Sequence, residues 1–325
     1  MAPRDGTIAF EGAPALRLAP EALAAHLTGS TRTRRAPAAT RVLAGAMPEP
    51  LLSSRSRGWV GIDVELHRFH DLDVVVQAPD HVIAVHLAGA VTVRREHAAL
   101  VRSRTMTPGD VTITPVGPPI RWRQAGQSLV LLVRLSPQHI RVVAGDDWPA
   151  RADRFDIHAV FSARDAQIEQ LGHRLLAGLE LEGADSRLHV DTLACELAVK
   201  LLRDYTGVAS SPPWAKARLS PHKLRRAIAF IDGNLRGELT LAAIADAVAL
   251  SPGHFAHAFR NATGVTPHRY IVERRVECAK ALLRTSDLAL TEIAAMVGCA
   301  SHSHFSVLFH RVAGMTPREF RRSVR

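Results

Sequence analysis

The chain has 325 residues, of which 47% are hydrophobic, and its 41 Lys and Arg against 31 Asp and Glu give a formal net charge of +10. No run approaches the eighteen or so uninterrupted apolar residues that span a bilayer, and the N-terminus lacks the apolar core of a signal peptide. We therefore expect a cytoplasmic protein of two or more domains, with no membrane partner.

The three cysteines, Cys195, Cys278 and Cys299, lie far apart and form no C-x-x-C pair. Cytoplasmic thiols stay reduced, so this spacing favours buried free thiols over a disulfide or a zinc site.

Residues 1–57 are expected to form an N-terminal arm. Residues 21–27 could form a short helix, whereas the basic, Ser/Thr/Ala/Pro-rich run from Ser30 to Arg41 is typical of a mobile segment. This run could touch DNA, but its composition favours a solvated loop.

Residues 58–160 show the period of two that is typical of short β-strands. The turns between them contain Asp, Gly and Pro, as in an antiparallel barrel or sandwich. Such barrels commonly hold a small ligand, so we expect an effector site here, with unknown residues. The predicted strand residues are Ile62, Val64, Leu66, Val74, Val76, Val82 to Val85, Val91, Val93, Val111, Ile113 and Leu129 to Val133.

The segment from Thr107 to Pro119 resembles the second motif of a cupin barrel. Metal-binding cupins have a histidine two or three residues beyond this segment, but here Ile120, Arg121 and Trp122 follow it. The resemblance therefore implies a cupin-like fold without the usual metal ligand.

Four other histidines, His67, His70, His81 and His86, lie on separate strands or turns without a recognised metal spacing. Structural or surface roles are favoured for them. The chain also has no Gly-x-Ser-x-Gly motif, phosphate-binding loop or paired carboxylates. We therefore predict no enzymatic activity, no metal and no cofactor.

Residues 161–207 return to a helical period, with one leucine stripe from Ile168 to Leu179 and another from Leu193 to Leu202. We expect a helical hairpin around residues 182–185 that serves dimerisation or packs on the barrel. Residues 208–218 contain Ser210-Ser211-Pro212-Pro213 and are predicted to be the interdomain linker.

The last segment, residues 219–325, repeats a unit at an offset of 50 residues. Ser251, Phe255, Phe259 and Gly264-Val265-Thr266-Pro267 in the first copy correspond to Ser301, Phe305, Phe309 and Gly314-Met315-Thr316-Pro317 in the second. Each copy has helical periodicity, a turn, a serine N-cap and a second helix with an apolar i, i+3, i+4 face. This pattern favours two helix-turn-helix units over ordinary helical hairpins, because the charge is also concentrated here.

Residues 219–325 carry 15 Lys and Arg against 8 Asp and Glu, which leaves a net charge of only +3 for the preceding 218 residues. A phosphate-binding surface requires such a concentration of basic charge. The outward face of each second helix is then the candidate DNA-binding surface. Its residues are Pro252, Gly253, Ala256, His257 and Arg260 in the first copy and His302, Ser303, His304, Ser306 and Val307 in the second.

These motifs, together with Arg274-Arg275, Leu282-Leu283, Ile293-Ala294 and Gly298, resemble the DNA-binding domain of the AraC/XylS family of bacterial transcription regulators. The resemblance implies two helix-turn-helix units joined by one long helix that starts at Thr266-Pro267 and ends near Leu283. It also implies promoter DNA, RNA polymerase, a homodimer and a small-molecule effector as partners, with action at the nucleoid.

Carried over residue by residue, the resemblance assigns base reading to Gly253, Ala256 and His257 and to Ser303, His304 and Val307. The chain departs from the family where His257 and Val307 replace a frequent arginine, and where Cys299 replaces a phenylalanine. Without an arginine fork for guanine, base reading at His257 and Val307 should be softer or should favour thymine methyl groups.

The predicted fold class is therefore multidomain α+β: a cupin-like barrel at residues 58–160, a helical hairpin and an all-α double helix-turn-helix domain. Two alternatives remain for the function. One is a ligand-independent DNA-binding protein, and the other is a cupin-type enzyme fused to a DNA-binding domain.

Overall fold

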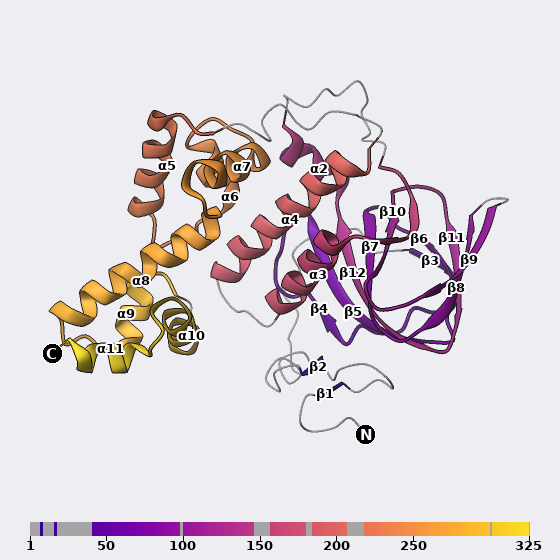
Figure 1. Cartoon of the computed structure of the whole chain (residues 1–325), viewed down its shortest axis with the longest axis horizontal. Coiled ribbons are helices and arrows are strands. Elements are labelled where there is room, and N and C mark those ends of the chain that lie inside the picture. The colour runs from indigo at the N-terminus through magenta and orange to yellow at the C-terminus, as the bar shows by residue number, and fades with distance from the viewer. Residues whose placement is uncertain are drawn as a thin grey trace. The chain divides into compact units, whose positions relative to one another are not determined.

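The computed structural model describes residues 7–8, 16–17, 41–97, 100–145, 157–179, 184–206, 218–299 and 301–324 (Figure 1). The predicted helix at 21–27, nearly all of the basic run from Ser30, and the linker at Pro212-Pro213 lie outside these residues. Two compact units are present. The first comprises Met1–Ile140, Ala152–Glu180 and Lys200–Ala209, and the second comprises Arg141–Arg151, Leu181–Val199 and Ser210–Arg325.

The first unit contains two antiparallel sheets. The six-stranded sheet runs in the order β13 (Val160–Arg164), β10 (Asp110–Thr114), β7 (His81–Ala88), β12 (Gln127–Leu135), β5 (Ile62–His70) and β4 (Leu52–Ser53). The five-stranded sheet runs in the order β3 (Arg41–Ala44), β6 (Asp73–Gln77), β11 (Ile120–Ala125), β8 (Val91–His97) and β9 (Leu100–Met106). A separate pair joins β1 (Thr7–Ile8) to β2 (Leu16–Arg17).

The expected barrel is not closed. Among the described residues, no strand of one sheet pairs with a strand of the other. A barrel closes only when a continuous register carries the hydrogen bonds around it. Here β4 and β3, at two of the sheet edges, have only two and four residues. The first unit is therefore a sandwich of two sheets around an apolar interior.

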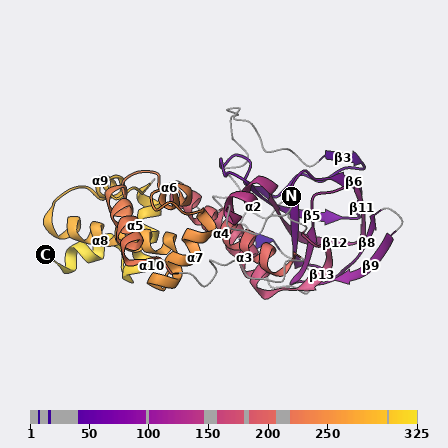
Figure 2. The same ribbon diagram turned by 90° about the horizontal axis from the view of Figure 1, so that it is seen from above.

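Helix α3 (Ala166–Gly178) covers the outer face of the six-stranded sheet and contacts β5, β7 and β12 (Figure 2). Gly172 allows the close approach, because a Cβ there would lie 3.2 Å from Val85 and 3.4 Å from Leu131. Both faces of β5 and β12 are consequently buried, and the strict period of two is lost there.

Several elements were absent from the sequence prediction. Strands β9 and β11 carry arginines at alternating positions, and β9 is exposed along nearly its whole length, so neither shows an apolar period. Strand β13 lies in the segment expected to be helical. The short helix α2 (Pro137–Ala144) was also missed. The predicted helices at residues 161–207 are present as α3 and α4 (Ala184–Asp204), and α4 already begins within the range 182–185 where the turn was expected.

The second unit contains the predicted helices of the repeat. The first copy consists of α5 (Pro221–Gly233), α6 (Leu241–Asp246) and α7 (Pro252–Thr263), and α8 (Pro267–Thr285) follows it. The second copy consists of α9 (Leu290–Met296), α10 (His302–Ala313) and α11 (Pro317–Ser323). The Oγ atoms of Ser251 and Ser301 accept hydrogen bonds from the backbone N–H groups of His254 and His304, which confirms the serine N-caps.

Helix α8 starts where Thr266-Pro267 predicted it and ends two residues beyond Leu283. Its 19 residues at 1.5 Å each span about 28 Å. Gly264 and Gly314 end α7 and α10 in the left-handed conformation that glycine tolerates best, with φ of 80° and 75°. The two copies thus share their local geometry.

Candidate functional site

Each helix-turn-helix unit is built around three aromatic rings at equivalent positions. In the first copy Phe255 packs on Phe259, and Phe259 packs on Tyr270, both with ring centroids 5.4 Å apart. In the second copy Phe305, Phe309 and Phe320 make the same contacts at 5.8 and 5.6 Å. These rings fix the buried side of α7 and α10. The same packing therefore fixes the orientation of the opposite side of each helix.

Arg275 of α8 joins the two copies. Its side chain is only 2% exposed. Its Nε donates to the Leu235 carbonyl at 3.1 Å and its Nη2 to the Gly237 carbonyl at 3.2 Å, both in the connection between α5 and α6. Gly298, in the turn after α9, fits against the same guanidinium, since a Cβ there would lie 3.0 Å from Nη2. One buried cation therefore ties both units to the helix between them.

The candidate DNA-reading face of α10 is open. His302, Ser303 and Val307 are exposed, with Val307 at 64%, while His304 and Ser306 are half-buried. An exposed valine on a polar helix face has no packing role in the described part of the chain. Its methyl groups are free for the apolar contact with a thymine methyl that the sequence suggested.

The corresponding face of α7 is partly covered. Gly253 and Ala256 are buried, Pro252 and His257 are half-buried, and Arg260 is exposed. A Cβ on Gly253 would lie 2.5 Å from the carbonyl oxygen of Val143, at the end of α2. The expectation that Gly253 and Ala256 lie on an outward face is therefore not met in this structure.

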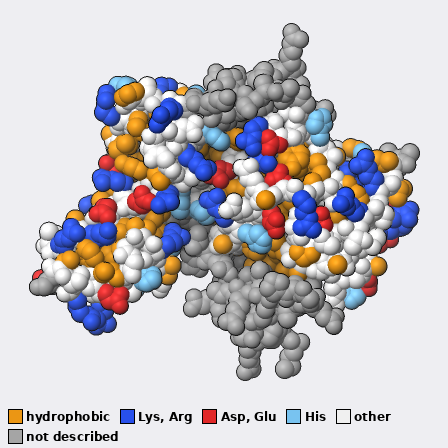
Figure 3. All heavy atoms as spheres, viewed as in Figure 1, with side chains coloured by type: hydrophobic (Ala, Val, Ile, Leu, Met, Phe, Trp, Pro, Cys, Tyr) orange, Lys and Arg blue, Asp and Glu red, His pale blue; other side chains and the backbone are white. Residues whose placement is uncertain are grey.

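A groove beside α10 is lined by basic residues that were not among the predicted DNA-binding residues. His302 and Ser306 line it together with Arg318, Arg321 and Arg322 of α11. Arg321 is anchored by a hydrogen bond to the Leu288 carbonyl at 2.6 Å, whereas Arg318 and Arg322 are exposed. On the face in Figure 3, Lys and Arg side chains outnumber Asp and Glu over the C-terminal helices. The sequence signal for these arginines was their position just after the second Gly-x-Thr-Pro motif.

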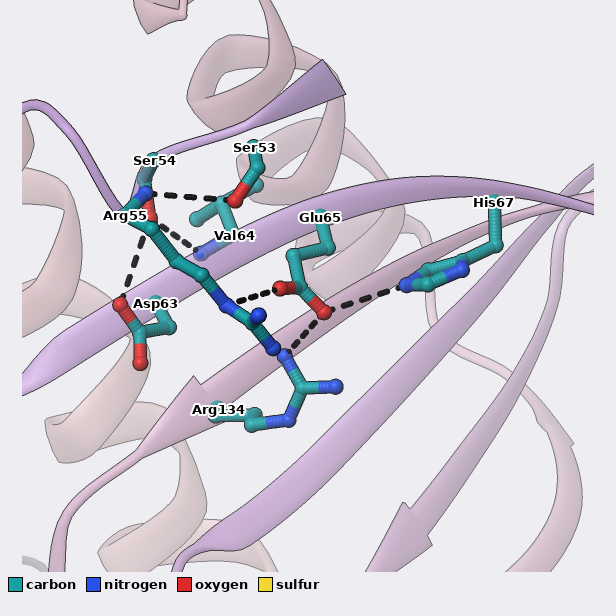
Figure 4. Close-up of polar contacts among 8 residues, drawn as sticks. All are labelled: Ser53, Ser54, Arg55, Asp63, Val64, Glu65, His67 and Arg134. Carbon is teal, nitrogen blue, oxygen red and sulfur yellow. Dashed lines mark hydrogen bonds and ion pairs between the residues drawn. The ribbon is translucent and has the colours of Figure 1, made fainter. Parts of the chain in front are cut away.

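The interior of the first unit contains a buried ionic cluster (Figure 4). Glu65 of β5 is 1% exposed and meets Arg134 at 2.6 Å, Arg55 at 2.8 Å and the Nε2 of His67 at 3.1 Å. Burial raises the pKa of Glu65, but the hydrogen bonds and charges of these partners outweigh burial and bring it to about 2. Glu65 is therefore ionised at neutral pH, and its carboxylate is shared by Arg134 and Arg55.

A cavity of about 120 Å³ lies between the sheets next to this cluster. Most of its lining is apolar, with Phe69, Val93, Met106 and Trp122 among the larger side chains. Arg134 and His86 are part of its polar lining. The first unit thus contains an apolar cavity in the region where an effector site was expected, between two sheets and not inside a closed barrel.

The four histidines that were considered as metal ligands do not converge. Among the described residues, no group of three or more His, Cys, Asp or Glu side chains could hold a metal ion. His67, His81 and His86 are buried and His70 is exposed. Cys195 and Cys299 are buried free thiols and Cys278 is half-buried. No helix in the described ranges is long and apolar enough to cross a membrane.

Comparison with known proteins identifies a helix-turn-helix domain in the second unit. Residues 244–323 match the family model of a helix-turn-helix domain. The transcriptional activator RhaS of Escherichia fergusonii is 39% identical over 99 residues, which are 30% of this chain and 36% of RhaS. The bifunctional transcriptional activator/DNA repair enzyme AdaA of Bacillus subtilis is 38% identical over 92 residues, 28% of this chain and 44% of AdaA.

A solved AraC-type transcriptional regulator from Chromobacterium violaceum is 28% identical, with a TM-score of 0.31, and covers 32% of this chain and 92% of its own. The chain spans 36% and 44% of the length of the two curated relatives above. What these proteins share with it is the repeated helical unit. Residues 244–323 therefore form a helix-turn-helix domain of the AraC/XylS type, as the repeated motifs indicated.

Proposed function

We propose that this protein is a transcription regulator that binds promoter DNA through α7 and α10. The proposal rests on the exposed face of α10. This face lies beside Arg318, Arg321 and Arg322, in the second copy of the helix-turn-helix unit. Phosphate contacts from arginines supply affinity, and side chains on the helix face supply specificity.

In this proposal each helix of the pair enters its own major groove. Helix α8 spans about 28 Å, close to the ~34 Å between successive major grooves on one side of B-DNA. Arg275 holds the two units on this helix, so their spacing is set before DNA binds. The base-reading residues are proposed to be Ser303, His304 and Val307 in α10 and His257 in α7.

The proposed effector site is the cavity between the two sheets of the first unit. We also propose a homodimer. The leucine stripes of α3 and α4 are already buried within the single chain, so the proposed interface uses other residues. A promoter-bound regulator acts in the cytoplasm at the nucleoid, and RNA polymerase is its proposed partner there.

The proposal is tested by selecting bound sequences from a random DNA pool with the full-length chain and footprinting the selected site. Each subunit should protect an asymmetric site that spans two successive major grooves. Protection of a single groove per subunit, or no sequence preference, would contradict the proposal.

A matched pair of variants tests the role of α10. Val307→Glu places a carboxylate on the exposed face toward phosphate, and should lower affinity for the selected site at least tenfold. Val60→Glu makes the same change at a valine that is 61% exposed in the first unit, and should leave DNA binding unchanged. Equal losses in both variants would show that added negative charge alone explains the effect.

The two other readings of the sequence have their own tests. A cupin-type enzyme would contain a bound metal, so metal analysis of the purified protein addresses it. A ligand-independent DNA-binding protein would keep the same affinity for the selected site when the cavity is filled by Ala84→Leu. Ala84 lines the cavity.

A further inference from the structure

The cavity between the sheets has one polar group whose bonding is incomplete. His86 lines the cavity and is 6% exposed, and its Nδ1 is buried without a hydrogen-bond partner. An unsatisfied buried polar group costs roughly 1–3 kcal/mol, so native structures seldom keep one without a purpose. Burial lowers the pKa of His86 to about 4, so the imidazole is uncharged at neutral pH. It can then donate one hydrogen bond and accept another.

Four other polar side chains of the lining have partners. Gln124 donates to Ser128 Oγ at 2.9 Å, and Thr112 donates to the Phe161 carbonyl at 2.9 Å. Arg134 pairs with Glu65 at 2.6 Å. Arg123 pairs with Asp73 at 3.2 Å and with Glu96 at 3.3 Å. Each arginine in the described lining therefore already has an acidic partner, which disfavours an anionic ligand.

The apolar part of the lining sets the size and character of the ligand. Its 120 Å³ is roughly ten times the space that one water molecule needs. Phe69 and Trp122 offer flat surfaces on which a ring can pack. A sugar is disfavoured, because most of its hydroxyl groups would have no hydrogen-bond partner in this lining.

We propose that the cavity binds an uncharged, ring-sized apolar molecule with one hydroxyl or carbonyl group, and that His86 makes the hydrogen bond to that group. The proposal rests on the assignment of effector binding to the first unit. It adds the chemical class of the effector and the residue that selects it.

Arg95 provides the one competing reading in the described part of this unit. It is 7% exposed, its Nε has no hydrogen-bond partner, and its guanidinium lies 5.7 Å from the centre of the Trp122 ring. A ligand carboxylate could pair with it. Arg95 is not among the residues that line the cavity, however, so the structure favours a neutral ligand.

The test uses three probes with the same rings: naphthalene, 1-naphthol and 1-naphthoate, titrated calorimetrically into the full-length protein at pH 7.5. One hydrogen bond to His86 should make 1-naphthol about five- to tenfold tighter than naphthalene. The carboxylate of 1-naphthoate must be desolvated without a free cation, so it should bind more weakly than both.

Three variants test whether His86 and the cavity are responsible for these affinities. His86→Leu should reduce the affinity for 1-naphthol to that for naphthalene, and unchanged naphthalene binding would show that the cavity is still folded. His70→Leu changes an exposed histidine of β5 and should alter no affinity. Ala84→Leu fills the cavity and should abolish binding of all three probes.

Two results would overturn the proposal. The first is tightest binding of 1-naphthoate that is lost in Arg95→Met, which would identify an anion site. The second is the absence of binding of any probe to the folded wild-type protein. DNA binding without a probe is measured in parallel. A protein that binds its DNA site but no naphthol refutes only the cavity proposal, and the reverse result refutes only the DNA-binding function.

Discussion

Helices α7 and α10 occupy equivalent places in the two copies of the repeat, yet one face is covered and the other is open. Both begin at a capping serine, end at a left-handed glycine and pack through the same pair of phenylalanines. Gly253 is buried against Val143, whereas Ser303, 50 residues later, is exposed. The two helices therefore have the same local geometry, but their outward faces are not equally exposed to solvent. In this structure the candidate DNA-reading face is open on α10 and partly covered on α7.

The largest effect should come from the residue that the two copies share. Arg275→Met removes the donors to the Leu235 and Gly237 carbonyls and leaves the buried Leu235 carbonyl without its partner. We expect a loss of about 3 kcal/mol in the free energy of unfolding. DNA affinity should fall as well, because the spacing of α7 and α10 is no longer set. Urea denaturation and a binding titration measure the two effects.

The half-buried Arg274 provides the matched control for that substitution. It pairs with Asp232 at 2.9 Å on the surface, so Arg274→Met should cost well under about 1 kcal/mol. Similar losses for Arg274→Met and Arg275→Met would show that burial of Arg275 is not what stabilises the junction.

The next prediction compares Gly253 with Ser303 directly. An added Cβ at Gly253 would lie 2.5 Å from the Val143 carbonyl, so Gly253→Ala should lower the free energy of unfolding by about 1–2 kcal/mol despite alanine's better helix propensity. Ser303→Ala at the exposed equivalent position should raise it by up to about 0.5 kcal/mol. A stabilised Gly253→Ala variant would show that α7 is as open in solution as α10.

A smaller difference should separate the exposed arginines of the two copies. Arg318→Ala should weaken binding to all DNA sequences by about threefold to tenfold and reduce the slope of log affinity against log salt by about one. Arg260→Ala should do less, since Arg260 also faces Glu196 at 4.0 Å. Affinities measured from 50 to 200 mM salt decide the order. A change of sequence preference in either variant would instead assign that arginine to base reading.

The smallest effect concerns a cap that only the second copy has. Glu319 accepts a hydrogen bond from the Thr316 backbone N–H at 2.7 Å, and this bond and one from the Thr316 hydroxyl lower its pKa. Arg269 stands at the equivalent position of the first copy. A lowered pKa in the folded state contributes stability above the ordinary value of 4.5 that is lost as the pH falls below it.

Glu319→Gln should therefore flatten the dependence of the melting temperature on pH between about 5 and 3. Arg269→Gln should leave that dependence as in the wild type. An unchanged pH profile for Glu319→Gln would mean that the cap adds nothing to the stability of the folded chain.

The helical part of the protein was largely predictable because its signals are local. Serine caps, Thr-Pro starts and i, i+3, i+4 phenylalanine patterns depend on residues a few positions apart. Each of these signals occurs twice, because the unit repeats after 50 residues. The sheets were less predictable. Strand β9 is exposed along nearly its whole length and β11 alternates arginine with other residues, so neither carries an apolar period that could reveal it.

The sequence by itself determined the two helix-turn-helix units, their caps, the long helix between them and the concentration of basic charge near the C-terminus. Tertiary structure alone decided that the sheets stay unclosed, that Arg275 is the shared anchor, and that Gly253 is covered while Ser303 is not. It also decided that His86 lines a cavity with an unsatisfied nitrogen. The physical reason is that propensity and capping depend on neighbours in the chain, whereas burial depends on groups such as Val143 and Leu235 that lie tens of residues away.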